Sequence, residues 1–490
     1  MYQTIILGSI LVATLYVLKH RHDPKLPLVP YKIPIIGHTY SYLTNCEEFL
    51  KQCRREYGDI FSLYIYGQVK TFVGKEHSHE VFAKDDNFSF GLAFNKVFPG
   101  DVLLSHLGEF KNSTKVLKDY ILSKLKFYTK RMQTSLLLAT QKRIGNCDEP
   151  KAFNNLYHLM TRIISTPIAN LFIGEEESKY EEVITTFAEF TRDAAGFLAI
   201  PPFLDFIYPG LQNYVTRITL RLGLYNPTIK HKDILIKHIK TQVLKRLQEK
   251  EKLGDSWERP ADFLQDLMDE ENFDPNNVNY PLMADKMCIY IFVSVHTTSR
   301  TCANAVMDLA SRPEYMQELY EEQLEVHKDA DENDILPFEA LDKMKKLDCF
   351  IRESLRLTGN ISGLPHVVLK DYTFSNGLQV PKDHSVEIYF DDTYGDELLQ
   401  GSNPKSFDPF RHMKTNPSAA KVTKNFLAFG GGKHACPGRY FAINEVKFFM
   451  HNLILKYNFR TESGKIVKKK RFGPMAFPSS EKVIFENRSK

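Results

Sequence analysis

Cys436 lies in a loop whose composition suits a metal-bound thiolate. The run is Phe429-Gly-Gly-Gly-Lys-His-Ala-Cys-Pro-Gly438, and residues 439–457 follow it with apolar side chains at a helical period. The cysteine is therefore expected at a helix N-terminus, where free N–H groups and the helix dipole favour a thiolate. Pro437 needs no N–H partner in a first helical turn. The three glycines allow the loop to bend so that amides point at the sulfur, and such donors tune a metal-bound thiolate.

The same run carries a family resemblance. Phe429, Gly432, His434, Cys436 and Gly438 fill the fixed positions of the haem-binding motif of the cytochrome P450 superfamily, which the run therefore resembles. The resemblance implies that these five residues bind the cofactor, haem b (iron protoporphyrin IX), and that Cys436 ligates its iron. The alternative is an incidental cysteine in a glycine-rich turn, because free cysteine is commonly a small buried hydrophobe. Five matched positions in ten residues argue against that alternative.

A second motif is the pair Glu353 and Arg356, in a segment from Lys345 to Leu357 that is predicted to be helical. The i, i+3 spacing places the carboxylate and the guanidinium on one helix face. Alone, such a pair is common on protein surfaces and proves little. It resembles the buried Glu-x-x-Arg pair of the family, which a third residue joins. By that resemblance the third residue is Arg411, and the triad has a structural role in assembling the haem pocket.

A third feature is the largely apolar helix predicted over Met287 to Ala305. The family's central helix carries an acid and a threonine over the haem, and by that resemblance Thr297 is the catalytic, oxygen-handling threonine. His296 stands where the family usually has an acid, and Ser294 stands at a usual glycine position beside the substrate. Histidine can transfer protons, so His296 is assigned to proton delivery, with neutral space-filling as the alternative.

The resemblance also implies cations for the haem propionates and side chains for the substrate pocket. His366 is the candidate cation on a strand after the Glu353 helix. The family's Trp-x-x-x-Arg is absent, since the one tryptophan is Trp257. Lys118 is assigned in its place, with Lys115 as the open alternative. The substrate-pocket residues near the C-terminus are expected to be Met475 and Phe477, for which an apolar core is the alternative.

Composition sets limits on the class of protein. The chain has 490 residues with 43% hydrophobic and 12% aromatic residues, which suits a globular fold with a large apolar pocket. A net charge of +4 is too small to indicate nucleic-acid binding. Seven scattered cysteines, an odd number, argue against a disulfide framework and for a reducing compartment. No Gly-x-Gly-x-x-Gly run supports a flavin or nicotinamide domain.

The N-terminal sequence predicts a membrane anchor. Residues 2–18 are uncharged and mostly apolar, long enough as a helix to span about 26 Å, and Lys19 begins a basic run. The positive-inside rule then leaves the following domain in the cytosol. A cleavable signal peptide is the weaker alternative, since no basic residue precedes the apolar run. Residues 23–37 contain four prolines, which predicts a stiff linker like the family's hinge. We therefore expect an anchor over 1–20, a hinge over 21–40 and one catalytic domain over 41–490.

The resemblance extends over nearly the whole chain and implies a mainly α fold with small β-sheets (α+β), of the fungal microsomal P450 type. The expected protein is a single-pass endoplasmic-reticulum enzyme that oxidises a small lipophilic molecule with O2 and NADPH. Its electrons are expected from a membrane-bound NADPH-cytochrome reductase. A steroid, terpenoid or other secondary metabolite is favoured as substrate. A basic stretch over 101–146 is either a docking patch for that reductase or a solvated face. Two alternative functions remain open: a haem-thiolate isomerase or dehydratase that needs no reductase, and a non-catalytic haem- or lipid-binding protein at the membrane.

Overall fold

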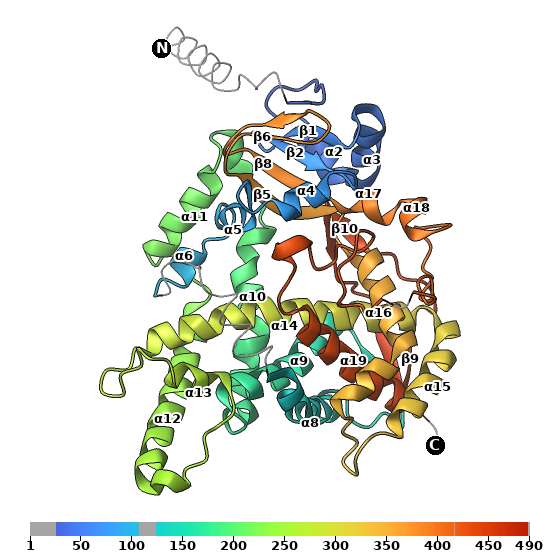
Figure 1. Cartoon of the computed structure of the whole chain (residues 1–490). Helices are drawn as coiled ribbons and strands as arrows, with labels where there is room; N and C mark the ends of the chain where they lie inside the picture. Colours follow the sequence, from blue (N-terminus) through green and yellow to red (C-terminus); the bar gives the residue numbers. More distant parts are fainter. Residues whose placement is uncertain (1–25, 107–123, 416, 489–490) are drawn as a thin grey trace.

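The computed structural model describes residues 26–106, 124–415 and 417–488. Figure 1 shows the strands β1, β2, β5 and β8 at one end of the molecule and a mainly helical region at the other, with α14 (Tyr280–Ala310) running across the middle. This mixture of many helices and small sheets agrees with the fold class that the sequence predicts. Predicted residues 1–20 of the anchor, and Lys115 and Lys118, lie outside the described residues. Within the described ranges, no helix is long and apolar enough to cross a membrane.

Helices of very different length make up most of the regular structure. In chain order they are α2 (Thr39–Thr44), α3 (Cys46–Tyr57), α4 (Ser78–Ala83), α5 (Phe90–Asn95), α6 (Gly100–Leu103), α8 (Leu125–Arg143), α9 (Leu156–Ile173), α10 (Glu181–Ala199), η4 (Phe203–Phe206), α11 (Leu211–Arg221), α12 (Ile229–Leu253), α13 (Phe263–Met268), α14, α15 (Met316–His327), α16 (Lys345–Thr358), α17 (Phe390–Tyr394), α18 (Glu397–Gln400), η8 (Gly432–His434) and α19 (Arg439–Lys456).

The strands form one mixed sheet and three smaller ones. They are β1 (Ile60–Ile65), β2 (Gln68–Val73), β3 (Phe88–Ser89), β4 (Lys151–Phe153), β5 (Ser362–Val368), β6 (Tyr372–Thr373), β7 (Gln379–Val380), β8 (Ser385–Tyr389), β9 (Tyr457–Thr461), β10 (Lys470–Phe472), β11 (Met475–Phe477) and β12 (Val483–Asn487). The largest sheet has the order β1-β2-β8-β5-β3. Tyr66 and Gly67 both have positive φ, as a two-residue hairpin turn requires, and they join β1 and β2 as an antiparallel hairpin.

The central helix α14 organises the helical region. It begins at an N-cap, where the side chain of Asn279 accepts a hydrogen bond from the Leu282 N–H, and Pro281 fits the first turn. It packs against α9, α10, α12, α16 and α19, so most of its length is buried. Val293 and Thr297, one turn apart, are the exception: both are exposed on one stripe of the helix. A buried helix that exposes one short stripe marks the part of the core where a ligand can lie.

The described part of the predicted hinge lies against the mixed sheet. The N–H of Val29 donates to the Ser62 carbonyl at 2.9 Å, and Tyr31 stacks on Tyr64 with ring centroids 5.2 Å apart. Leu26 and Val29 are buried. These contacts fix the direction in which the chain enters the domain.

Candidate active site

The Cys436 loop is a tight turn closed by backbone hydrogen bonds. The N–H of Cys436 donates to the Phe429 carbonyl at 2.8 Å. Gly430 and Gly432 have φ of 77° and 56°, a conformation that side chains disfavour. A Cβ on Gly431 would lie 2.5 Å from the ring of Phe82, and one on Gly432 would lie 2.3 Å from the Phe82 carbonyl oxygen. The glycines are therefore required both for the turn and for the close approach of α4.

The Cys436 thiol lies at the start of α19, as the sequence predicts. The other six cysteines are buried, whereas Cys436 is exposed. Although the residue is exposed, its sulfur lies against enough protein that burial raises the pKa of the thiol, while the neighbouring N–H groups of Gly438 and Arg439 and the charge of Arg439 lower that pKa. An exposed cysteine with N–H groups beside its sulfur suits an axial metal ligand.

Thr297 and Ser294 both bond to their own helix. The Thr297 hydroxyl donates to the Val293 carbonyl at 2.8 Å and the Ser294 hydroxyl to the Tyr290 carbonyl at 2.5 Å. Thr297 is exposed and Ser294 is half-buried. Because α14 packs on α19, the helix that exposes Thr297 contacts the helix that Cys436 precedes (Figure 1). The structure thus brings the two predicted elements together.

His296 points to α9 instead of sharing the exposed stripe. Its Nδ1 lies 2.5 Å from the Tyr157 hydroxyl, and the two rings meet edge to face. Burial, and secondly the charge of Arg300, lower the pKa of His296 to about 4. Burial raises the pKa of Tyr157 to about 12. Both groups are neutral near pH 7, so they form a neutral hydrogen-bonded pair directly beside Thr297.

The three members of the predicted triad are in contact and buried. Nε and Nη2 of Arg356 donate to the two carboxylate oxygens of Glu353, both at 2.8 Å. Nε of Arg411 lies 3.5 Å from Oε1 of Glu353. The Asp408 N–H donates to the same oxygen at 3.0 Å. The remaining donors of Arg411 reach backbone carbonyls, including that of Ser402 at 2.7 Å. One carboxylate therefore joins α16 to the loop that precedes the cysteine.

The comparisons with known proteins decide the family. The model of the family described as cytochrome P450 matches residues 27–484. The chain belongs to the cytochrome P450 family. Among curated relatives, it is 30% identical to cytochrome P450 monooxygenase 71 of Postia placenta, over 67% of this chain and 65% of that protein. It is 25% identical to cytochrome P450 monooxygenase olcJ of Penicillium canescens, over 94% of this chain and 89% of that protein. Several such matches, the first included, span just under two thirds of the relative's length.

The propionate candidates of this cytochrome P450 lie near the Cys436 loop. His366 is buried on β5, with Nδ1 2.7 Å from the Leu364 carbonyl oxygen. Its ring lies between Phe82 and Phe90, with ring centroids 6.1 Å and 6.0 Å away. Phe82 also packs on the glycines of the cysteine loop, so this one side chain contacts both His366 and that loop. His434 lies in η8 of the same loop.

The predicted substrate residues Met475 and Phe477 lie on the short hairpin β10–β11. Phe477 is 41% exposed and Met475 is half-buried. The carbonyl of Ala476, between them, accepts a 2.8 Å hydrogen bond from Arg300 of α14. The hairpin therefore contacts the central helix one turn beyond Thr297.

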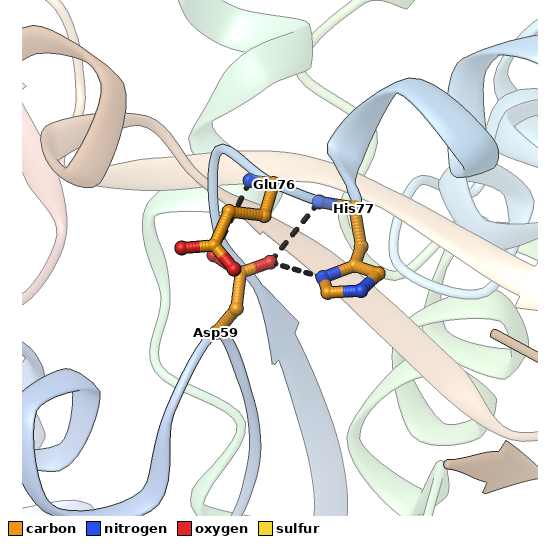
Figure 2. Close-up of side chains that lie close together, drawn as sticks. All are labelled: Asp59, Glu76 and His77. Carbon is orange, nitrogen blue, oxygen red and sulfur yellow. Dashed lines mark hydrogen bonds and ion pairs between the residues drawn. The ribbon is translucent and has the colours of Figure 1, made fainter. Parts of the chain in front are cut away.

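Another cluster in this cytochrome P450, Asp59, Glu76 and His77, has the geometry of a metal site (Figure 2). Asp59 Oδ2 accepts from Nδ1 of His77 at 2.6 Å. The guanidinium of Arg54 lies 3.1 Å from Asp59, 2.8 Å from Glu76 and 3.1 Å from Asp392. The arginine thus supplies the cation that the carboxylates need, so the cluster is an ionic link between α3, α4 and α17.

Three residues near the site were not found from the sequence. Tyr157 and Phe82 are ordinary core aromatics in sequence, and no local pattern indicates their long-range contacts. Arg300 had a signal: it is a single cation within the apolar stretch predicted as the central helix. A charge at such a position is costly unless it has a partner, so it marks a site to inspect.

Proposed function

We propose that this cytochrome P450 is a haem-thiolate monooxygenase that oxidises a small lipophilic molecule with O2 and NADPH. The observation that carries the proposal is Cys436, the exposed cysteine on a tight glycine loop, placed before the helix that packs on α14, where Thr297 is exposed. These residues fit haem b: Cys436 would ligate its iron as a thiolate, and His366, which packs on Phe82 beside the cysteine loop, is the candidate for a propionate. When bound, haem supplies oxygen activation, which a thiolate ligand favours.

The side chains of α14 are proposed to manage protons. The hydroxyl hydrogen of Thr297 is held by the Val293 carbonyl, so its oxygen can accept a hydrogen bond on the exposed stripe. His296 replaces the usual acid and is neutral near pH 7. A phenol is a stronger acid than an imidazole, so the Tyr157 O–H donates to Nδ1 and leaves the proton of His296 on Nε2. When the Nε2 proton is released, the Tyr157 proton passes to Nδ1, which leaves a phenolate that must regain a proton from solvent.

Membership of the family supports a choice of redox partner and substrate class. We propose NADPH-cytochrome reductase as the electron donor, and a steroid, terpenoid or other secondary metabolite as the substrate. The names of the fungal relatives as monooxygenases support the reaction. An isomerase or dehydratase of peroxides is the alternative, and the exposed Thr297 favours the monooxygenase. Turnover that proceeds without NADPH and reductase would select the alternative.

We also propose a single-pass endoplasmic-reticulum anchor over residues 1–20, with the catalytic domain in the cytosol. Apolar side chains near the entry of the chain support contact with lipid: Ile33, Ile35, Phe203 and Ile207 are each more than half exposed. Phe203 lies in η4, which packs on the β1–β2 turn through Tyr66. Sedimentation of the full chain with microsomes after an alkaline carbonate wash, with the domain open to added protease, tests this placement.

The deciding experiment is the carbon monoxide difference spectrum of the reduced, purified protein. The red-shifted band of a thiolate-ligated haem is expected for the natural chain and for Cys147→Ala, a buried cysteine far from the loop. Cys436→Ala should lose it. A blue-shifted band in the natural protein, or folded protein without haem, would remove the ligand assignment and the monooxygenase proposal with it.

A further inference from the structure

Arg300 is a partly buried cation at the edge of the candidate substrate site. It lies on α14 one turn beyond Thr297 and four residues after His296. One terminal nitrogen, Nη2, donates to the carbonyl of Ala476 at 2.8 Å and to that of Thr358 at 3.5 Å. Ala476 stands between Met475 and Phe477, so the guanidinium lies against the hairpin that carries both substrate candidates.

No carboxylate of the described residues forms an ion pair with Arg300, unlike Arg54, Arg246 and Arg356. Burial lowers the pKa of Arg300, and the charge of Arg471 lowers it further. Its other charged or titratable neighbours are Tyr157 and His296, both neutral near pH 7. A cation withdrawn from water without a counter-ion is costly, because backbone carbonyls supply only partial charge. An anion arriving beside this guanidinium would therefore be bound strongly.

We propose that Arg300 binds the carboxylate of the substrate, which makes the substrate class a lipophilic carboxylic acid. The inference rests on the proposed monooxygenase function and deepens it. The surfaces nearby are apolar, with Val293 and Phe477 about half exposed, so the body of the ligand must be a hydrocarbon. The Nε and Nη1 hydrogens, which the two carbonyls leave unused, can donate charge-assisted hydrogen bonds to carboxylate oxygens.

A carboxylate beside Arg300 could also be a haem propionate, and the experiment separates the two sources. The haem-loaded enzyme is first checked for its carbon monoxide band, so that failure of the proposed function is seen by itself. The affinities of matched acids and methyl esters are then measured by adding each to the enzyme and recording the shift of the haem absorption spectrum. The pairs are abietic acid with methyl abietate, and dodecanoic acid with methyl dodecanoate. The enzymes compared are the natural chain, Arg300→Gln, Arg300→Lys and Arg471→Gln.

We expect at least one acid to bind about tenfold or more tightly than its ester, as one charge-assisted pair provides. The preference should vanish in Arg300→Gln, persist partly in Arg300→Lys and remain in Arg471→Gln, whose guanidinium bonds to the Gly359 carbonyl. Equal binding of acids and esters, binding of no acid, or an unchanged preference in Arg300→Gln would overturn the proposal. Loss of haem from Arg300→Gln without a change in preference would assign the arginine to a propionate and overturn it as well.

Discussion

The triad around Glu353 allows a quantitative test of how the haem pocket is assembled. Glu353→Gln keeps the size of the side chain and removes its charge. In the natural protein the Glu353 and Arg356 side chains are 3% and 2% exposed, and Arg411 is 7% exposed. The substitution leaves two buried guanidinium groups without their counter-ion and sets an amide N–H2 against a donor. Breaking a buried pair in this way costs about 3–5 kcal/mol.

Not all of that cost is expected, because both arginines keep other acceptors. Arg356 retains the Tyr394 carbonyl at 2.8 Å, and Arg411 retains backbone carbonyls. We therefore expect the lower end of the range, about 3 kcal/mol. The measurement is the urea midpoint of the haem-loaded protein at unchanged slope. The matched control is Glu462→Gln, which breaks a 3.0 Å pair with Lys482 whose side chains are 48% and 42% exposed.

The control should cost no more than about 1 kcal/mol, as exposed pairs do. If Glu353→Gln costs no more than Glu462→Gln, the buried network contributes nothing beyond a surface pair and the reasoning is wrong. If the cost appears only in haem-loaded protein and not in the apoprotein, the triad acts through the haem loop alone.

Three further outcomes are expected. Gly432→Ala should weaken haem retention far more than Gly464→Ala. Both glycines have positive φ, 56° and 63°, but only a Cβ at position 432 would collide with Phe82. The haem content of each variant after gel filtration measures the difference. Tyr157→Phe should lower the amount of product formed per NADPH consumed while the carbon monoxide band is kept. Tyr457→Phe, which loses a hydrogen bond to the Gly145 carbonyl, should leave the product per NADPH unchanged. An equal product yield per NADPH in both variants would argue against proton transfer through Tyr157 and His296. Burial lowers the pKa of His451 to about 3 in the folded protein, so the unfolded chain binds a proton at a higher pH than the folded chain does. The free energy of unfolding should therefore fall as pH drops from about 6.5 toward 3, by a loss that approaches about 5 kcal/mol. The urea midpoint measures this loss, and His451→Gln should flatten its pH profile over the same range.

Local patterns predicted the elements that carry the site. The helix expected over Lys345 to Leu357 runs over Lys345–Thr358, and the helix after Cys436 begins at Arg439 as expected. Each has a short-range cause: an amphipathic period in the first, and in the second a Pro437-Gly438 turn whose Gly438 is the N-cap. The central helix is longer than expected, Tyr280–Ala310, because Asn279 caps it upstream of the apolar stretch.

Long-range contacts could not be predicted in the same way. Tyr157 meets His296 across 139 residues of sequence, and Phe82 meets a loop near residue 431. Such contacts depend on how helices cross, which neither periodicity nor composition determines. Arg411 was placed through the family resemblance, since nothing in its own neighbourhood indicates a buried partner in α16.

The replacement of an acid by His296 and the uncompensated charge of Arg300 belong together. A carboxylate at position 296 would lie one turn from Arg300 and could pair with it, as i, i+4 opposite charges do. With histidine there, the arginine keeps its charge unneutralised, and the same charge helps to hold His296 neutral. On the two proposals above, the substitution has two effects: it changes the group beside Thr297 from an acid to a neutral imidazole, and it leaves the charge of Arg300 for a substrate carboxylate. An enzyme with an acid restored, His296→Asp, should accordingly lose its preference for carboxylic acids even though Arg300 is intact.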